Sequence, residues 1–285
     1  MPTRNSRSAA ETTVPAAFDA AAARRRCMQY RRRILDISQK VTALHIAPAF
    51  SCLEMTDVIY NGLMRPGEGR HSRDLFLMSK GHGCMSQYVI LEDLGIMPSE
   101  EIERYCTPAG VLGAHPDRGT PGIEASTGSL GHGLGIGVGM AYAETLKNTD
   151  CRVHVVLSDG ELQEGSTWEA MQMAANLRLE NLLLFIDLND FGGLERISEA
   201  HHAVFPVVEK LEAFGWEAVQ ANGHDAEAIH AAAAGRRGAR PFALVGKTVK
   251  GRGVSYMEHV PIWHYRSPSK DEYAQALAEL REVRS

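Results

Sequence analysis

Apolar and polar residues alternate in blocks along the second half of the chain. Short apolar runs predict strands, and the segments between them carry apolar residues at helical spacing. The predicted strands cover residues 153–157, 182–187, 216–219 and 242–247, and the predicted helices cover residues 166–178, 204–214 and 225–236. Strands that alternate with helices are typical of a parallel sheet. The pattern therefore predicts an α/β fold, a parallel β-sheet covered by helices on both faces.

The first half of the chain favours helices, at residues 20–40, 55–64 and 85–94. The first of them carries two runs of three arginines, residues 24–26 and 31–33, which we expect on a solvated helix face. Residues 131–139 have Gly at every second position. They predict a poor helix, because each Gly costs about 1 kcal/mol relative to Ala. Tight packing against another element would explain them.

The chain contains no internal repeat and no obvious linker, so we expect one domain at residues 23–285. Residues 1–22 are rich in Ala, Arg, Ser and Thr. They predict a flexible N-terminal tail. An organelle transit peptide is the alternative for this segment, although Glu11 and Asp19 count against it.

The composition of the chain argues against several classes of function. The formal net charge of −5 gives no support for nucleic-acid binding, and no apolar run approaches the roughly 18 residues that a membrane span needs. The five cysteines are scattered and form no C-x-x-C pair, so neither a disulfide framework nor a zinc site is indicated. A cytoplasmic protein is the expectation.

Polar residues follow two of the predicted strands. Asp159 comes directly after the first strand, and Asn189 follows the second strand, 30 positions further on. The carboxyl ends of parallel strands share one edge of a sheet, where α/β proteins bind their ligands. A carboxylate and an amide oxygen suit Mg²⁺ that takes its other ligands from a diphosphate. Both residues could instead be ordinary loop caps, because Asp and Asn are favoured in turns.

Ser166 and Glu169 have the spacing of a capping box, so the order of elements is strand, Asp-Gly loop, helix, strand, Asn loop. This βαβ unit resembles the thiamine-diphosphate enzymes, whose signature is Gly-Asp-Gly followed about thirty residues later by Asn. Within them the chain is similar to transketolases, and most of all to the N-terminal subunit of split, two-chain transketolases. The resemblance runs from about Arg31 to the C-terminus and rests on further segments in family order: 78–83, 114–116, 121–124, 127–133, 247–253 and 263–264.

The resemblance implies a bound thiamine diphosphate with Mg²⁺ or Ca²⁺. The metal ligands it implies are Asp159, Asn189 and the main-chain carbonyl of Phe191. The implied cofactor-binding residues are His82, Gly128, Ser129, Leu130, Gly160, Glu164 and Asn189. Glu164 and Glu169 also match family acids near the subunit interface.

Three more histidines, His45, His115 and His264, match residues that bind the sugar substrate, and we treat them as the candidate catalytic residues. Imidazoles titrate near pH 6.5 and can pass protons as C–C bonds form and break. The chain departs from the family pattern at Ser158, where a Gly is usual, and at His132, where a Gln is usual. Phe50 would add bulk if it faced the donor pocket.

These residues imply a transketolase that moves a two-carbon ketol unit from a ketose donor to an aldehyde acceptor. A C-terminal partner subunit would supply the activating Glu, and an α₂β₂ assembly is expected. Within this cofactor class, the alternatives are a specialised ketol or acyl transferase of secondary metabolism and a 2-oxo-acid dehydrogenase α-type subunit. Outside it are a non-catalytic cofactor-binding or regulatory protein and a metal hydrolase, although no His-x-x-x-His pair for the latter occurs on a helix.

Overall fold

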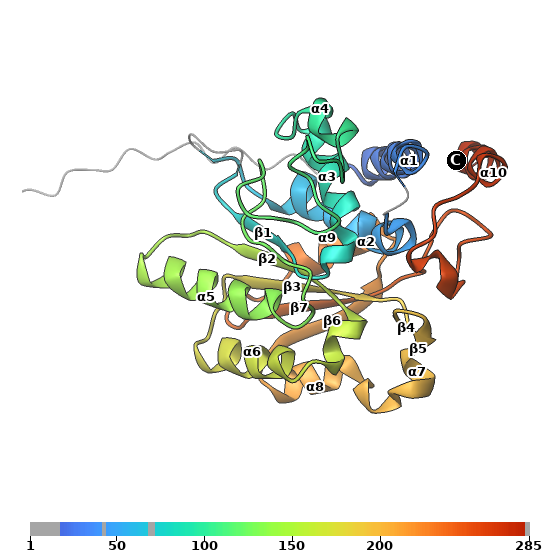
Figure 1. The fold of residues 1–285 in the computed structure, drawn as a ribbon. Coiled ribbons are helices and arrows are strands. Elements are labelled where there is room, and N and C mark those ends of the chain that lie inside the picture. Colours follow the sequence, from blue (N-terminus) through green and yellow to red (C-terminus); the bar gives the residue numbers. More distant parts are fainter. Residues whose placement is uncertain (1–17, 42–43, 68–71, 283–285) are drawn as a thin grey trace, which may run out of the picture.

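The computed structural model of the chain describes residues 18–41, 44–67 and 72–282. Its centre is a five-stranded, all-parallel sheet in the order β1-β2-β3-β7-β6 (Figure 1). The strands are β1 (Leu75–Met78), β2 (Val153–Ser158), β3 (Leu182–Leu188), β6 (Glu217–Asn222) and β7 (Phe242–Lys247). Every residue of β1, β2 and β3 is buried, as expected for a sheet with both faces covered.

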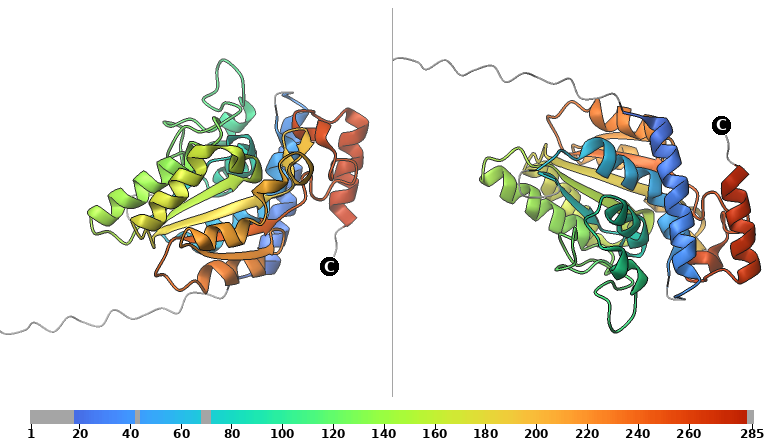
Figure 2. Two further views of the ribbon diagram at one scale, coloured as in Figure 1. Left: turned by 90° about the horizontal axis from the view of Figure 1, so that it is seen from below. Right: turned by 90° about the horizontal axis from the view of Figure 1, so that it is seen from above.

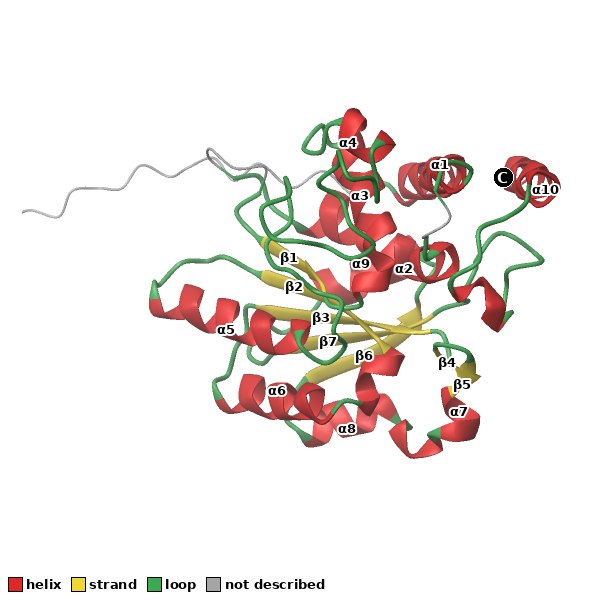
Figure 3. Cartoon of the chain, in the orientation of Figure 1, coloured by secondary structure: helices red, strands yellow, loops and turns green. Residues whose placement is uncertain are grey.

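Helices lie on both faces of this sheet (Figures 1 and 3). One face carries α1 (Ala20–Ser38), α2 (Ile46–Val58), α3 (Cys84–Asp93) and α9 (Ala226–Ala234). The other carries α5 (Gly133–Leu146), α6 (Gly165–Asn176) and α8 (Val207–Ala213). Each face has its own apolar core, because successive strand residues point to opposite sides: Val156 packs in one core and Val155 in the other. The predicted α/β fold is thus confirmed.

Shorter or peripheral elements surround these layers. They include α4 (Ser99–Glu103), α7 (Ile197–Ala200), α10 (Lys270–Glu282) and a hairpin of β4 (Phe191–Gly192) and β5 (Glu195–Arg196). Helix α10 lies beside α1, outside the sheet layers (Figure 2). None of the helices in the described ranges is long and apolar enough to cross a membrane.

Several boundaries differ from the sequence prediction. Residues 1–17 of the predicted tail lie outside the described residues. The tail ends earlier than predicted, because Asp19 caps α1 and the helix begins at Ala20. The helix predicted at 55–64 begins earlier, at Ile46, and ends in a short π-helical turn, Ile59–Leu63. Strand β1 and helices α4, α5, α7 and α10 were not predicted by the pattern.

The basic segment of α1 is not simply a solvated face, so that prediction is wrong for three of its arginines. Arg26 pairs with Asp57 on α2, and the Arg31 guanidinium, itself buried, lies 2.7 Å from Glu54 on α2. Arg33 pairs with Glu92 on α3. These ion pairs join α1 to the helices beneath it.

The capping box predicted at Ser166 and Glu169 is also wrong. Helix α6 begins at Gly165, and its cap residue makes no side-chain bond to the helix. The Ser166 hydroxyl instead donates to the carbonyl of Gly131 at 2.9 Å, because the glycine-rich loop packs against this helix end. A capping box does form between Ser158 and Glu161, at the start of the separate 3-10 turn Asp159–Gln163 that precedes α6.

Candidate functional site

The ends of β2 and β3 place Asp159 and Asn189 at the same edge of the sheet. Ser158 pairs in register with Asp187, so the two loops leave adjacent strands side by side. The Asp159 carboxylate accepts a hydrogen bond from the Asp190 amide at 2.6 Å, and the Asn189 amide oxygen accepts one from the Phe191 amide at 3.1 Å. Both side chains are buried.

The electrostatics of Asp159 favour a cation beside it. Burial, followed by the negative charge of Asp187, raises the pKa of Asp159 to about 7. Among the described residues, no group of three or more His, Cys, Asp or Glu side chains could hold a metal ion. A cation here would need other oxygen ligands, and a diphosphate can supply them. The carboxylate of Asp159 and the amide oxygen of Asn189 fit Mg²⁺ on those terms.

A buried charged cluster beneath this edge fixes the Asn189 amide. The Lys80 ammonium pairs with Asp187, and both side chains are fully buried. Asp187 also accepts hydrogen bonds from Ser51, Thr248 and the Asn189 amide nitrogen, the last at 3.1 Å. Because the amide nitrogen is held by Asp187, the amide oxygen of Asn189 faces the other way.

The candidate histidines gather in a cavity of about 330 Å³ above this edge. The His45 ring centre lies 6.1 Å from that of His82, 5.6 Å from that of His115 and 5.5 Å from that of His264. These residues come from four separate segments spread over most of the chain: His45 precedes α2, His82 and His264 lie in short 3-10 turns, and His115 lies in a loop. The Nδ1 atom of His45 is buried and has no hydrogen-bond partner in the protein, so it is available to a ligand.

Three of these imidazoles are held neutral. Burial, with the nearby charges and imidazoles, lowers the pKa of His45 to about 4 and that of His264 to about 3. The pKa of His82 is lowered well below its usual value, mainly by burial. Near pH 7 each ring therefore offers one N–H donor and one acceptor nitrogen.

The cavity wall includes most, but not all, of the predicted cofactor-binding residues. Gly128, Leu130, Gly160, Glu164 and Phe191 line it together with the histidines. Ser129, which is exposed, and Asn189, which is buried, are not lining residues. His132, where the family usually has Gln, is exposed and does not line the cavity either. Phe50 is fully buried beneath Arg31 and does not line the cavity, so it adds no bulk there.

Local backbone geometry explains two features of the sequence. Ser158 has an extended backbone with φ of −93°, so the position does not require the glycine that is usual in the family. Gly81 does need to lack a side chain, because a Cβ atom there would lie 2.7 Å from the Cα atom of Gly128. The His82 loop and the glycine-rich loop approach each other closely at this point.

The sequence did not single out five residues at the site. Gln163, Gly192, Gly193 and Tyr265 line the cavity. Lys250 is buried, and its ammonium lies 2.8 Å from His264 Nδ1 and donates to the Gly193 carbonyl at 2.9 Å. Burial, then repulsion by Lys80, lowers the pKa of Lys250 to about 8. Lys250 stands in the matched segment 247–253, but nothing local in that segment places it beside a histidine.

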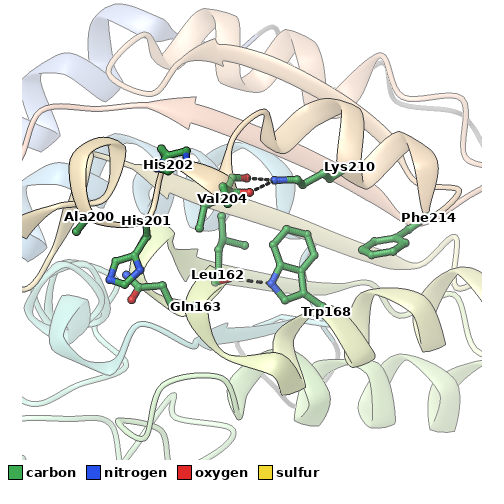
Figure 4. Close-up of a pocket in the computed structure, with 10 residues that line it drawn as sticks. Leu162, Gln163, Trp168, Ala200, His201, His202, Val204, Lys210 and Phe214 are labelled. Atoms are coloured by element: carbon green, nitrogen blue, oxygen red, sulfur yellow. Dashed lines mark hydrogen bonds between the residues drawn. The ribbon is translucent and has the colours of Figure 1, made fainter.

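A second, larger cavity of about 700 Å³ shares the lining residue Gln163 with the first (Figure 4). Trp168 and Phe214 form one wall, with ring centres 5.8 Å apart, and Leu162 and Val204 are buried beside them. The Lys210 ammonium donates to the Val204 carbonyl at 2.7 Å, so it holds the loop before α8 rather than facing the cavity unpaired.

Comparison with known proteins identifies the domain. Residues 23–278 match the family described as transketolase, thiamine diphosphate binding domain. An apulose-4-phosphate transketolase subunit of Phocaeicola vulgatus is 35% identical over 257 residues, which cover 88% of this chain and 91% of the relative. The 6-deoxy-6-sulfo-D-fructose transketolase subunit SqwG of Clostridium sp. is 31% identical over 256 residues, 88% of this chain and 93% of the relative. Human transketolase is 34% identical over 208 residues, 73% of this chain and 33% of the relative.

The solved transketolase from Leishmania mexicana superposes with a TM-score of 0.83 at 25% identity, over 91% of this chain and 41% of that one. Fold and sequence together define a thiamine diphosphate binding domain of the α/β class. The chain belongs to the transketolase family, as its motifs predicted. It spans about a third of the human protein and less than half of the Leishmania protein, but nearly the whole length of the subunits from Phocaeicola and Clostridium.

Proposed function

We propose that this chain is the N-terminal subunit of a two-chain transketolase that transfers a two-carbon ketol unit from a ketose to an aldehyde. The observation that carries the proposal is the meeting of four histidines above Asp159 and Asn189 at one sheet edge, in a chain of this family. The proposed domain covers residues 23–285, and we place the protein in the cytoplasm.

In this proposal Asp159, Asn189 and the Phe191 carbonyl hold Mg²⁺, or Ca²⁺ in its place. His82, Gly160 and Asn189 face the diphosphate, and the other cofactor contacts come from Gly128, Ser129, Leu130 and Glu164. Support comes from the burial and hydrogen bonding of the two metal-binding side chains and from the cavity, which is lined by His82, Gly128, Leu130, Gly160 and Glu164. Ser129 has the weakest support, because it is exposed in this chain.

Thiamine diphosphate supplies the carbanion chemistry of ketol transfer when it is bound. The protein's own part is to orient the sugar and move protons. His45, His115 and His264 all line the cavity. The neutral ring of His45 can accept a hydrogen bond from a sugar hydroxyl or donate one to its oxygen, whereas the neutral ring of His264, whose Nδ1 accepts from the Lys250 ammonium, carries its proton on Nε2 and can donate to a sugar oxygen. Lys250 holds His264 by its Nδ1 atom, which leaves Nε2 for the substrate.

The proposal includes a C-terminal partner subunit in an α₂β₂ assembly. Relatives of about the same length are themselves named as subunits of a transketolase, which implies a second chain in those proteins. The partner would contribute the Glu that activates the cofactor. The outer side of α5 and α6 supports a partner surface, because Tyr142, Leu146 and Met173 are 40%, 69% and 50% exposed. The relatives are named for apulose 4-phosphate and for a sulfofructose, so we propose a phosphorylated or sulfonated ketose as donor.

Calorimetric titration of thiamine diphosphate with Mg²⁺ tests the proposal. The chain is titrated alone and mixed with a C-terminal transketolase subunit from the same genome, and Asp159→Asn serves as the control for the metal site. We expect tight binding and ketol transfer only in the mixture with the unchanged chain. Turnover by the isolated chain would contradict the two-chain part, and absence of binding in both samples would contradict the cofactor assignment.

A further inference from the structure

A line of buried polar contacts runs from the surface helix α1 to the catalytic cavity. Arg31 on α1 pairs with Glu54 on α2 at 2.7 Å. Glu54 Oε2 lies 2.9 Å from Nδ1 of His224, in the loop between β6 and α9, and both side chains are only 9% exposed. The backbone amide of Val249, after β7, donates to His224 Nε2 at 2.8 Å. His224 thus joins three separate segments of the fold.

These contacts specify one form of the imidazole. An amide N–H can donate only to a bare ring nitrogen, so Nε2 of His224 carries no proton. The ring proton is then on Nδ1, where it points to the carboxylate of Glu54. That carboxylate is ionised: burial raises its pKa, but Arg31 and His224 outweigh burial and lower the pKa of Glu54 to about 2. A carboxylate that accepts from Nδ1–H is a common device for fixing a histidine tautomer.

The amide held by His224 belongs to the segment that enters the site. Lys250 is the next residue, and its ammonium contacts His264 and the Gly193 carbonyl, both in the cavity wall. On either side of Val249, Thr248 donates to Asp187, and the Gly251 amide donates to the Ala47 carbonyl at 3.2 Å. The Thr248 amide also donates to the Leu188 carbonyl, and the Lys250 carbonyl accepts from the His259 amide, each at 3.1 Å. Within this segment, the backbone amide of Val249 is the one that donates to an imidazole, that of His224.

We propose that His224 is a positioning residue: as a neutral ring with its proton on Nδ1, it holds Val249 so that Lys250 reaches His264. The inference rests on the proposed function only in treating that cavity as the catalytic site. His224 does not line the cavity, and both of its ring nitrogens are engaged within the protein, by Glu54 and by the Val249 amide. Its effect passes through the backbone of the 248–251 segment.

The first test reads the tautomer in the isolated chain. The protein is labelled with ¹⁵N-histidine, and long-range ¹H–¹⁵N correlation at pH 7.5 separates the protonated and bare nitrogens of each ring. His224 is one of 12 histidines, and its signals are assigned by their loss in His224→Gln. We expect a neutral ring with the proton on Nδ1. A proton on Nε2, or on both nitrogens, would overturn the proposal whatever the enzyme does.

The second test uses a matched pair of variants. Gln can place an oxygen near the former Nε2 position and keep an acceptor for the Val249 amide. Asn can place a nitrogen near the former Nδ1 position, keeping the donor to Glu54 but not reaching Val249. In the assembled enzyme we expect kcat/KM to fall about tenfold or more in His224→Asn, the loss of roughly one buried hydrogen bond, and less than about threefold in His224→Gln.

A second readout separates positioning from simple loss of stability. Reductive ¹³C-methylation of the chain lets the Lys250 amine be titrated by NMR, with Lys250→Met as the assignment control. We expect the Lys250 titration to move toward the usual lysine range in His224→Asn but not in His224→Gln. Equal effects of both variants on Lys250, or none, would show that His224 only supports the fold. If the unchanged enzyme shows no ketol transfer, the proposed function fails, while the tautomer and the Lys250 titration still decide this inference.

Discussion

Asp159 shows at the residue scale how a binding site can oppose stability. Its carboxylate is fully buried beside Asp187, and the Lys80 ammonium pairs with Asp187 rather than with Asp159. A buried charge without its own counter-charge is costly, so the carboxyl holds its proton more tightly in the folded chain than in the unfolded one. The ionised Asp159 carboxylate therefore destabilises the metal-free chain but is well suited to bind a cation.

This imbalance predicts a stabilising substitution at Asp159. The folded pKa of about 7 exceeds the unfolded value of about 3.8, so the stability of the metal-free chain falls as pH rises from about 4 to about 7. Above pH 7 the carboxyl is ionised in both the folded and the unfolded chain, so the loss of stability is complete. We expect Asp159→Asn to raise the free energy of unfolding by about 1–3 kcal/mol at pH 8, and to change it much less at pH 4.

Urea unfolding of the metal-free chain at both pH values measures the difference. Asp117→Asn, at an exposed position, is the control and should change stability at neither pH. A less stable Asp159→Asn chain at pH 8 would contradict the prediction. The same variant should lose Mg²⁺-dependent cofactor binding, which separates its two effects.

Lys250 predicts the alkaline side of the activity profile. Its pKa is lowered to about 8, first by burial and then by Lys80, so the ammonium that contacts His264 is lost as pH rises through 8. We expect kcat/KM of the assembled enzyme to fall with that titration. Lys250→Met should lose about tenfold at pH 7 and show no titration near pH 8. An unchanged alkaline limb in Lys250→Met would assign that titration to another group.

At the element scale, the sequence predicted strands and helices best where the apolar runs are long. The four strands β2, β3, β6 and β7 and the helices between them follow the pattern within a few residues. Strand β1 has only four residues, too few to distinguish from any short apolar run. Helix α5 was judged poor because helix propensity counts only the cost of each Gly, whereas packing decides this helix.

The glycines of α5 have two different environments. A Cβ atom at Gly137 would lie 2.7 Å from a Val155 methyl of β2, while one at Gly135 would meet nothing within 4 Å. We expect Gly137→Ala to destabilise the isolated chain by about 1–3 kcal/mol, because the helix would be pushed from the sheet. Gly135→Ala should instead stabilise it by about 0.5–1 kcal/mol.

Thermal unfolding of the two variants, measured side by side, checks this pair. Because Ala improves the helix equally at both positions, the difference between them reports packing alone. Equal shifts of Tm would mean that α5 does not pack on β2 as closely as the structure shows.

The site residues that stand in recognisable sequence motifs were predicted, and those that are placed only by tertiary contacts were not. Asp159, Asn189 and the four histidines could be named because each stands in a recognisable segment of the sequence. Lys250 could not, because a lysine is expected in solvent unless its tertiary partner is known. His224 was missed for the same reason: one partner of its ring, Glu54, lies 170 residues away in the sequence, and the other is the backbone amide of Val249.

At the scale of the whole molecule, the exposed apolar side of α5 and α6 is the surface to test for assembly. Leu146 is the most exposed of its large apolar residues. We expect Leu146→Glu to leave the isolated chain as stable as before, because exposed substitutions rarely change stability by more than about 0.5 kcal/mol. Affinity for the C-terminal subunit should fall about tenfold or more if this surface is covered.

Sedimentation of the mixed subunits measures that affinity. Leu94→Glu is a matched control on the opposite side of the sheet, at the end of α3, where the exposed fraction is 40%. An unchanged affinity in Leu146→Glu, or equal losses in both variants, would move the partner surface away from α5.

The extended backbone at Ser158 also bears on how such domains are recognised in genomes. The backbone geometry of this chain does not require the Gly that is usual at position 158, because a φ of −93° admits almost any side chain. A search pattern that insists on Gly before Asp159 would pass over this chain, although its Asp, its Asn and their spacing are intact. A sequence pattern that allows any residue at position 158 and still requires the Asp and the Asn at the two strand ends should find more distant members of the family. It should not include proteins that lack these two metal-binding side chains.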